Sequence, residues 1–375
     1  MILPPRSHPR GSVSKPSSGL VIPMRATVSG RVRWQTLDER GVPEVPRSPS
    51  GFALATPEGV GQPNLITNYG LNQIASRDVF EVRPGVTGGW RRRLSVGTGS
   101  TAPAVTDTAL ANFAQADSTS GAFPNGSVTY ELDGTANVWR ATVVVTRLVT
   151  MTADRNLTEF GLNEEAALSL HIRELLRDGV GDPVTVSLLL GKSIRVDHTL
   201  TIEIPAPVAG NAISLDIEEY DVGNNLVATT PFSVVHGGHV MSLTTANLAE
   251  VFKAWSPPNI APLSARRRIT GSVTYARTAA YTSTSIVDPA TNAIAPFVTV
   301  EPYVPDSFER IKRHTSAAGE MNTAWHGFAF VNNINQLNNE LNRSGWFVQF
   351  VSPASYTKAD TDTLRVGTVS SWARA

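Results

Sequence analysis

The chain has 375 residues, of which 41% are hydrophobic and 17% are charged, and its formal net charge at pH 7 is zero. A neutral chain has no overall field that would draw it to nucleic acid or to an acidic membrane surface. It contains no cysteine, which excludes disulfide bonds and thiolate metal sites.

Glycine and proline are abundant, with 29 and 25 residues, as is typical of a loop-rich β protein. The first residues, MILPPRSHPRGS, lack the apolar run of a signal peptide, and no stretch of the chain has the length and hydropathy of a membrane span. We therefore expect a protein that is used in solution or within a particle.

Residues 1–63 are rich in Pro, Gly, Ser and Arg and predict an extended N-terminal arm. The arm contains one strand-like stretch, in which Val28, Val32 and Trp34 share one parity. An extended arm can pair with a neighbouring subunit, so these three residues are candidate interface residues. For residues 1–24 a disordered tail is an equally good interpretation.

The stretch Leu94–Phe113 reads LSVGTGSTAPAVTDTALANF and joins a strand end to a glycine-containing loop. Thr106 or Asp107 stands where the cap of a following helix is expected. Gly97 and Gly99 resemble the start of a phosphate-binding loop, but the third glycine and the Lys-Ser/Thr pair are missing. We therefore favour a strand, a turn and a short capped helix over nucleotide binding.

Trp90 is followed directly by Arg91, Arg92 and Arg93, and a second arginine triplet lies at 266–268. Arginines beside a tryptophan can bind phosphates or an acidic partner surface. Alternate residues of a strand point to opposite faces, however, so a solvated edge is the competing interpretation. Trp90 and the three arginines after it are candidate interface residues, and contact with DNA or an acidic surface is a secondary hypothesis.

Two segments predict antiparallel strands. The turn signal Asp133-Gly134 separates an alternating stretch from the β-branched run Val138–Val149, and this arrangement predicts a hairpin. Within Val184–Ile204 apolar residues alternate with polar ones, as in a strand with one buried face. His198 lies on the apolar parity, where a core histidine is expected more often than a ligand.

Other elements are short or ambiguous. Residues 64–77 predict a short helix, and Leu248, Val251, Phe252 and Trp255 have helical spacing within a predicted helix near 245–255. The segment Glu164–Arg177 fits a strand or a helix, and its alternating Leu and Ile residues favour the strand.

Two motifs could indicate an enzyme, but neither is complete. His236-Gly237-Gly238-His239 lacks a third metal ligand and a Gly-x-Ser-x-Gly partner, and a hairpin tip explains it better. The acidic residues from Asp216 to Asp221 fit a solvated strand and turn better than a catalytic carboxylate pair. We therefore expect no enzyme activity, no small-molecule substrate, and no catalytic, cofactor-binding or metal-binding residue.

The chain also resembles bacteriophage tail and neck structural proteins. The resemblance lies in a helix like NLITNYGLNQIA (64–75), in the VGTGSTAPAVTDTAL turn, in LTEFGL (157–162), in a strand pair like 184–204 and in the ending SSWARA. It covers about residues 64–204 and the last strand, and the rest of the chain matches no pattern of that family. The resemblance implies a strand within 164–177 and a role in virion assembly without catalysis.

We expect a mainly β fold, an antiparallel β-sandwich with an extended N-terminal arm and a few short helices. The expected organisation is an arm (1–63), a sandwich core (64–207), an insertion or second β-rich lobe (208–340) and C-terminal strands that return to the core sheet (341–375).

The expected function, implied by the resemblance, is that of a virion structural protein of the tail, the neck (collar) or an attached fibre. It would be made in the host cytoplasm and would assemble with its own copies and other virion proteins. The alternative is a host-receptor or carbohydrate-binding tail-fibre module, in which exposed aromatic residues such as Trp90, Trp255, Trp325 and Trp346 would stack on sugars.

Overall fold

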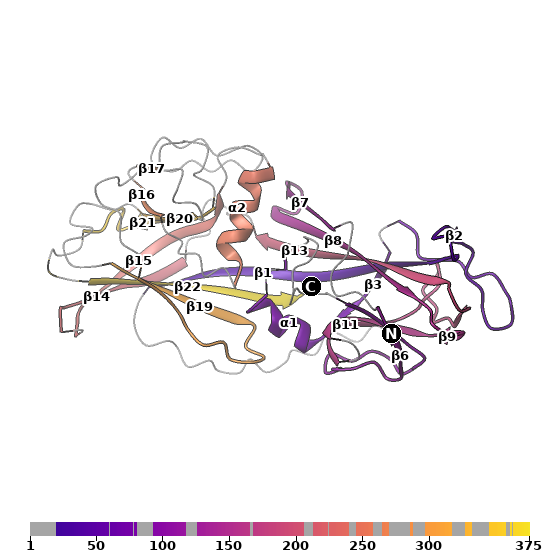
Figure 1. The fold of residues 1–375 in the computed structure, drawn as a ribbon. Coiled ribbons are helices and arrows are strands. Elements are labelled where there is room, and N and C mark those ends of the chain that lie inside the picture. Colours follow the sequence, from indigo (N-terminus) through magenta and orange to yellow (C-terminus); the bar gives the residue numbers. More distant parts are fainter. Residues whose placement is uncertain are drawn as a thin grey trace, which may run out of the picture.

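The computed structural model describes residues 20–59, 61–77, 79–80, 93–117, 126–165, 168–205, 213–223, 225–239, 245–257, 265–269, 286–287, 297–316, 327–331, 345–357, 361 and 363–375. The chain is mainly β, with largely antiparallel sheets and the short helices α1 (Asn68–Ile74) and α2 (Thr245–Trp255). The expected fold class is therefore confirmed. The molecule is elongated, and long strands run along it (Figure 1).

A large sheet forms the body of the molecule. Its main path is β17-β16-β20-β21-β15-β14-β22-β1-β13-β8-β7, and β2, β3, β18 and β19 attach beside this path. Its strands are β1 (Leu20–Leu37), β2 (Pro43–Glu44), β3 (Gln62–Pro63), β7 (Gly126–Asp133), β8 (Val138–Thr150), β13 (Ser193–Pro205), β14 (Ile213–Tyr220), β15 (Leu226–His239), β16 (Ala265–Ile269), β17 (Ile286–Val287), β18 (Phe297–Val300), β19 (Glu309–Ser316), β20 (Gly327–Val331), β21 (Gly345–Ser352) and β22 (Thr363–Arg374).

A smaller sheet packs on one face of this body and completes a sandwich. Its order is β4 (Leu65–Ile66), β11 (Leu168–Leu175), β10 (Glu159–Glu165), β5 (Arg93–Gly97) and β6 (Phe113–Ala116). Beside it lies a ribbon of β9 (Arg155–Leu157) and β12 (Val186–Leu188). Buried residues of both sheets, such as Leu200 and Phe160, belong to one hydrophobic cluster. The strand preferred for 164–177 is confirmed by β10 and β11.

The strands form where the sequence alternates. In β13 the residues Ile194, Val196, His198, Leu200, Ile202 and Ile204 are fully buried, and the residues that alternate with them are partly exposed. Burial of each apolar side chain among them contributes about 1.5–3 kcal/mol. The predicted hairpin is also confirmed, because β7 and β8 pair from Asp133 and Val138 outward.

The N-terminal arm was expected to lie outside the fold, and from Leu20 onward this expectation is wrong. Strand β1 pairs antiparallel with β13 over Thr27–Leu37 and parallel with β22 over Leu20–Val28. It therefore lies inside the large sheet and joins its two halves. Its partner strands are far away in the sequence, so no local pattern in residues 20–37 could show that the chain itself would pair with them.

The helices cover the core side of the sheet. Thr67 caps α1 by accepting a hydrogen bond from the Gly70 N–H at 3.0 Å. The predicted helix near 245–255 is confirmed as α2, whose apolar residues Leu248, Val251, Phe252 and Trp255 are buried. Phe252 contacts Phe80 and Tyr130, with ring centroids 5.8 Å and 5.4 Å apart. Residues of α2 therefore pack β7 against the core.

Candidate functional site: a glycine-rich loop, an apolar end and an outer trough

The glycine-rich loop, residues 98–112, encloses a buried carboxylate of the chain itself. Glu159 of β10 has no exposed surface. It accepts hydrogen bonds from the backbone N–H groups of Gly99 at 3.0 Å, Asn112 at 2.8 Å and Ala111 at 3.1 Å. The loop thus presents N–H groups to an anion, as a phosphate loop does, but Glu159 already occupies that position.

Arg173 of β11 completes this network. One of its nitrogens lies 2.8 Å from a carboxylate oxygen of Glu159, and another lies 2.6 Å from Asp107. It also donates to the carbonyl of Thr101 at 2.9 Å. Burial lowers the pKa of Arg173, but the hydrogen bonds and charges of Asp107 and Glu159 outweigh it, so the pKa is raised overall. The arginine therefore stays charged and ties the loop to the small sheet.

The two glycines permit this close approach. A Cβ atom at Gly97 or Gly99 would lie 2.6 Å or 2.5 Å from an oxygen of Glu159. The helix expected after Thr106 or Asp107 does not form, because the carboxylate of Asp107 binds Arg173 and the N–H of Ala104. The arrangement can order a loop, and its hydrogen-bonding groups are already used within the chain.

The predicted interface residues of β1 are covered by the chain itself. Val28, Val32 and Trp34 are only 1%, 1% and 2% exposed. The indole N–H of Trp34 donates to the carbonyl of Arg177 at 2.9 Å. These three residues therefore belong to the core, and their assignment to an interface between subunits is wrong.

Of the other predicted interface residues, only Arg93 belongs to the described part of the chain. Trp90, Arg91 and Arg92 lie outside the described residues. Arg93 begins β5, and its guanidinium lies 4.0 Å from the carboxylate of Asp117. The second triplet, 266–268, lies in β16.

The motifs considered for enzymes and sugar binding have structural positions. The residues His236–His239 form the end of β15 and pair with β21, so they are not a hairpin tip. The described residues contain no group of three or more His, Cys, Asp or Glu that could hold a metal ion. Trp255 and Trp346 are 0% and 2% exposed and cannot stack on a sugar, whereas Trp90 and Trp325 lie outside the described part of the chain.

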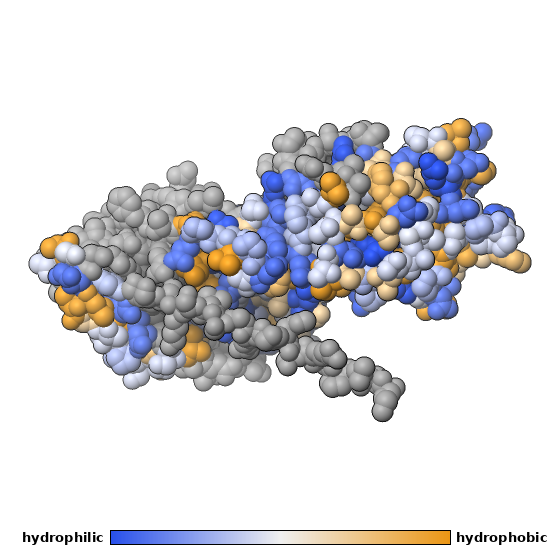
Figure 2. Space-filling model, turned by 90° about the horizontal axis from the view of Figure 1, so that it is seen from below, coloured by the Kyte–Doolittle hydropathy of each residue, from blue (hydrophilic) through white to orange (hydrophobic). Residues whose placement is uncertain are grey.

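Exposed apolar side chains gather in the turns at one end of the molecule. Figure 1 shows this end, where β2 and β9 lie. We call this set the apolar end. Its members are between 54% and 83% exposed: Val42, Val45, Phe52, Val180, Leu189 and Leu190. Figure 2 shows hydrophobic residues among hydrophilic ones over this part of the surface, at the right of the view.

The turns of the apolar end lie beside one another. The amide N–H of Gly179 donates to the carbonyl of Ala55 at 3.2 Å, and that of Ser187 donates to the carbonyl of Arg47 at 2.8 Å. Lys192 and Glu44 form an ion pair at 2.8 Å. The turns therefore form one surface instead of separate loops.

Side-chain hydrogen bonds fix the conformation of these turns. The Ser48 hydroxyl accepts from the Phe52 N–H at 3.1 Å, and the Asp178 carboxylate accepts from the N–H groups of Val180 and Asp182 at 3.0 Å. Gly51 has φ = 82°, a left-handed conformation that favours glycine. The apolar side chains are thus held in place before any partner arrives, which lowers the entropic cost of binding.

The sequence carries a signal for this surface that strand alternation and helical spacing do not reveal. Three turns of the apolar end share the pattern Asp/Ser-x-x-Gly-x, in the copies DERGV (38–42), SPSGF (48–52) and DGVGD (178–182). In each copy the first residue caps the turn through its side chain and the glycine precedes the return strand or loop. In two of the three copies a large apolar residue follows the glycine, and this combination marks the apolar end in the sequence.

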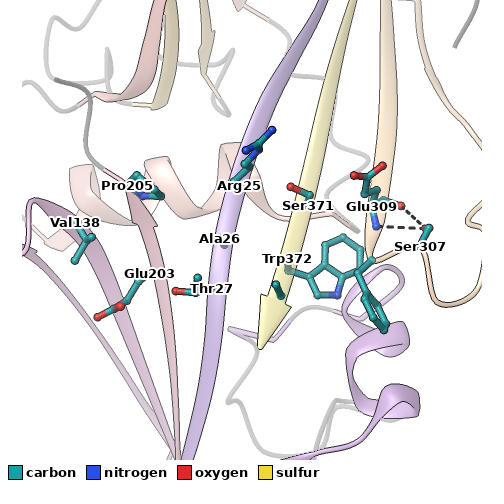
Figure 3. Close-up of a pocket in the computed structure, with 12 residues that line it drawn as sticks. Arg25, Ala26, Thr27, Val138, Glu203, Pro205, Ser307, Glu309, Ser371 and Trp372 are labelled. Atoms are coloured by element: carbon teal, nitrogen blue, oxygen red, sulfur yellow. Dashed lines mark hydrogen bonds between the residues drawn. The ribbon is translucent and has the colours of Figure 1, made fainter. Parts of the chain in front are cut away.

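A trough with a volume of about 510 Å³ lies where β13 separates from β1 (Figure 3). Directly opposed residues of neighbouring strands share a face of a sheet. Arg25 is opposite Ser371, which in turn is opposite Glu309, and Thr27 is opposite Glu203. These side chains therefore lie on the outer face, opposite to the core side chains of β1. Val138, Pro205, Ser307, Phe308 and Ala373 also line the trough.

The chain matches no family model, no curated protein and no solved structure. Within the part of the chain that the structure describes, we find no helix of sufficient length and hydropathy to cross a membrane.

Proposed function

We propose that this protein is a structural component of a bacteriophage virion, from the tail, the neck or an attached fibre. Its role is to assemble with copies of itself and with other virion proteins. The observation that carries the proposal is the apolar end: several large apolar residues stand exposed on turns whose conformation is already fixed. Large apolar side chains that are exposed together on one surface mark a protein–protein contact.

The remaining architecture supports the same role. The body is a long, largely antiparallel sheet, which is suited to lateral contact with a neighbour (Figure 1). The resemblance between residues 64–204 and phage tail and neck proteins includes the glycine-rich loop, whose function here is to order the small sheet through Glu159 and Arg173.

Purified phage particles provide the direct test. We expect the full chain in a fixed copy number in intact particles, measured by quantitative mass spectrometry and located by particle reconstruction. A chain that occurs in the lysate of infected cells but is absent from particles would contradict the proposal.

The apolar end can be tested separately with the purified full chain. We expect the double variant Phe52→Ser, Val180→Ser to weaken self-association by at least about tenfold, because anchors at an interface are worth about 2 kcal/mol or more each. Sedimentation velocity measures the effect. The matched control is Val304→Ser, since Val304 is 65% exposed outside the apolar end. Equal association of both variants and the parent would contradict an interface at the apolar end.

A further inference from the structure

The outer trough has an excess of negative charge. Glu203 and Glu309 line it together with Arg25. Glu203 also shares the guanidinium of Arg140 with Glu131 and Asp133, at distances of 2.8 Å and 2.9 Å. Four carboxylates therefore accompany two guanidiniums, which leaves a net charge of −2 among these residues. A cationic segment would be attracted to this part of the outer face.

The trough has dimensions that suit an extended peptide. Its lining comes from five neighbouring strands or strand ends, namely β8, β13, β1, β22 and the start of β19. Strands lie about 4.8 Å apart, so the trough crosses about 19 Å of sheet. An extended segment of about six residues covers this distance. Apolar groups from Val138, Pro205 and Phe308 line the trough together with the charged groups.

The chain itself contains a segment with the complementary composition. Residues 1–19, MILPPRSHPRGSVSKPSSG, precede the described part of the chain and carry Arg6, Arg10 and Lys15 without any acidic residue. The segment begins with three apolar residues and contains four prolines. Prolines favour an extended backbone and have no N–H group to satisfy, so such a segment loses little entropy when it binds in an extended form.

We propose that residues 1–19 of one copy of the protein bind in the outer trough of a second copy. This inference rests on the proposed assembly function and names one of its contacts. A second copy is favoured over the same chain because β1 enters the sheet at Leu20, about 17 Å before the trough at Arg25, and runs toward the trough. To reach the trough of its own chain, a segment before Leu20 would have to reverse direction, which is not required for binding to a second copy.

Single cysteines can test this contact cleanly, because the natural chain contains none. A full chain with Ser7→Cys is mixed with a full chain carrying Thr27→Cys, whose position is exposed in the trough. We expect the mixed disulfide to form at least about tenfold faster than with Thr150→Cys, because docking raises the local concentration of the two thiols. Thr150 is exposed on the same face, twelve residues along β8 from Val138.

Charge reversal in the segment gives a second readout that does not affect the fold of the sheet. We expect Arg6→Glu with Arg10→Glu to lower the rate of cross-linking about tenfold, and high salt to lower it similarly. Cross-linking no faster than with Thr150→Cys overturns the proposal. So does a chain carrying both Ser7→Cys and Thr27→Cys that cross-links only within monomers. If Thr27→Cys does not fold, Ala373→Cys, also exposed in the trough, replaces it.

Failure of this contact can be told apart from failure of the proposed function. If the protein is found in particles or forms oligomers, and the cross-link is absent, only the role of residues 1–19 is wrong. If it is absent from particles and monomeric as well, both proposals are wrong.

Discussion

At the scale of single residues, Glu159 connects the glycine-rich loop to the small sheet. It is fully buried, accepts three backbone hydrogen bonds and pairs with Arg173. We expect Glu159→Gln to cost about 3–5 kcal/mol, because the amide turns one acceptor into a donor and leaves a buried arginine undercompensated. Urea unfolding followed by circular dichroism measures the loss.

The control for this substitution is Glu131→Gln. Glu131 also pairs with an arginine, at 2.9 Å, but its side chain is 60% exposed. An exposed ion pair contributes about 0–1 kcal/mol, so this variant should unfold close to the parent. If Glu159→Gln lowered the free energy of unfolding no more than Glu131→Gln does, the network around Glu159 would not order the loop.

We expect His236 to make the protein sensitive to acid. Burial and the nearby charge of Arg25 lower the pKa of His236 from 6.5 to about 4. Between these two pH values the unfolded chain binds a proton that the folded chain does not, so stability falls as the pH falls from 6.5 to 4, by at most about 3 kcal/mol.

The substitution His236→Leu tests this pH dependence. The Nδ1 atom of His236 has no hydrogen-bond partner among the described residues, so an apolar side chain can replace the ring. Urea midpoints measured from pH 7 to pH 4 should fall less steeply for the variant than for the parent. Parallel curves would show that another group causes the acid sensitivity.

At the scale of elements, α2 is held at its C-terminal end by a buried lysine. Lys312 of β19 is 2% exposed and donates to the carbonyl of Ser256, the residue after α2, at 2.8 Å. Burial and then the charge of Arg310 lower the pKa of Lys312 to about 8. Between pH 8 and the unfolded value of 10.5, the unfolded chain binds more protons, so stability rises with pH across this window.

We expect Lys312→Met to remove this rise, which amounts to at most about 3 kcal/mol. The substitution loses one helix-end hydrogen bond, but it also removes the cost of a buried charge, so stability near neutral pH should change little. Thermal unfolding between pH 7 and 10.5 measures both effects. Lys253→Met, at an exposed lysine of α2 itself, is the control that should keep the rise.

The sequence patterns predicted correctly those strands and helices whose conformation is not changed by contacts with distant parts of the chain. The alternation of β13 and the helical spacing of α2 both appear in the structure as predicted. The prediction of a helix after Thr106 was wrong because the carboxylate of Asp107 accepts a hydrogen bond from Arg173, which lies far along the chain. The prediction of an arm was wrong from Leu20 because the paired residues in β13 and β22 lie 156–176 and 346 residues away in the sequence.

For the candidate site, the sequence identified the glycine-rich loop but not its ligand. Gly97 and Gly99 resemble the start of a phosphate loop, but the incomplete motif favoured a strand and a turn, and nothing in the sequence indicated that the N–H of Gly99 binds Glu159, sixty residues further along the chain. The outer trough had no sequence signal, because it depends on where β13 leaves β1.

At the scale of the whole molecule, β1 and β22 make the two halves one structural unit. Strand β1 pairs with β13 on one side and with β22 on the other. Strand β22 also pairs with β19 and carries Trp372, whose indole N–H donates to the carbonyl of Leu71 in α1 at 2.9 Å. A local change in β22 should therefore also lower the stability of strands in the opposite half, such as β13.

Trp372→Ala tests this coupling. Trp372 is 3% exposed and stacks on Tyr303 with ring centroids 6.1 Å apart, so its removal should cost about 3–5 kcal/mol. If the molecule unfolds as one unit, the slowest-exchanging amides of β13 should lose the same free energy of protection as those of β22. Hydrogen exchange with mass spectrometry resolves the two strands, and Val304→Ala is the exposed control. Loss of protection in β22 without a change in β13 would show that the halves unfold independently, and the strand pairing through β1 would then not couple them.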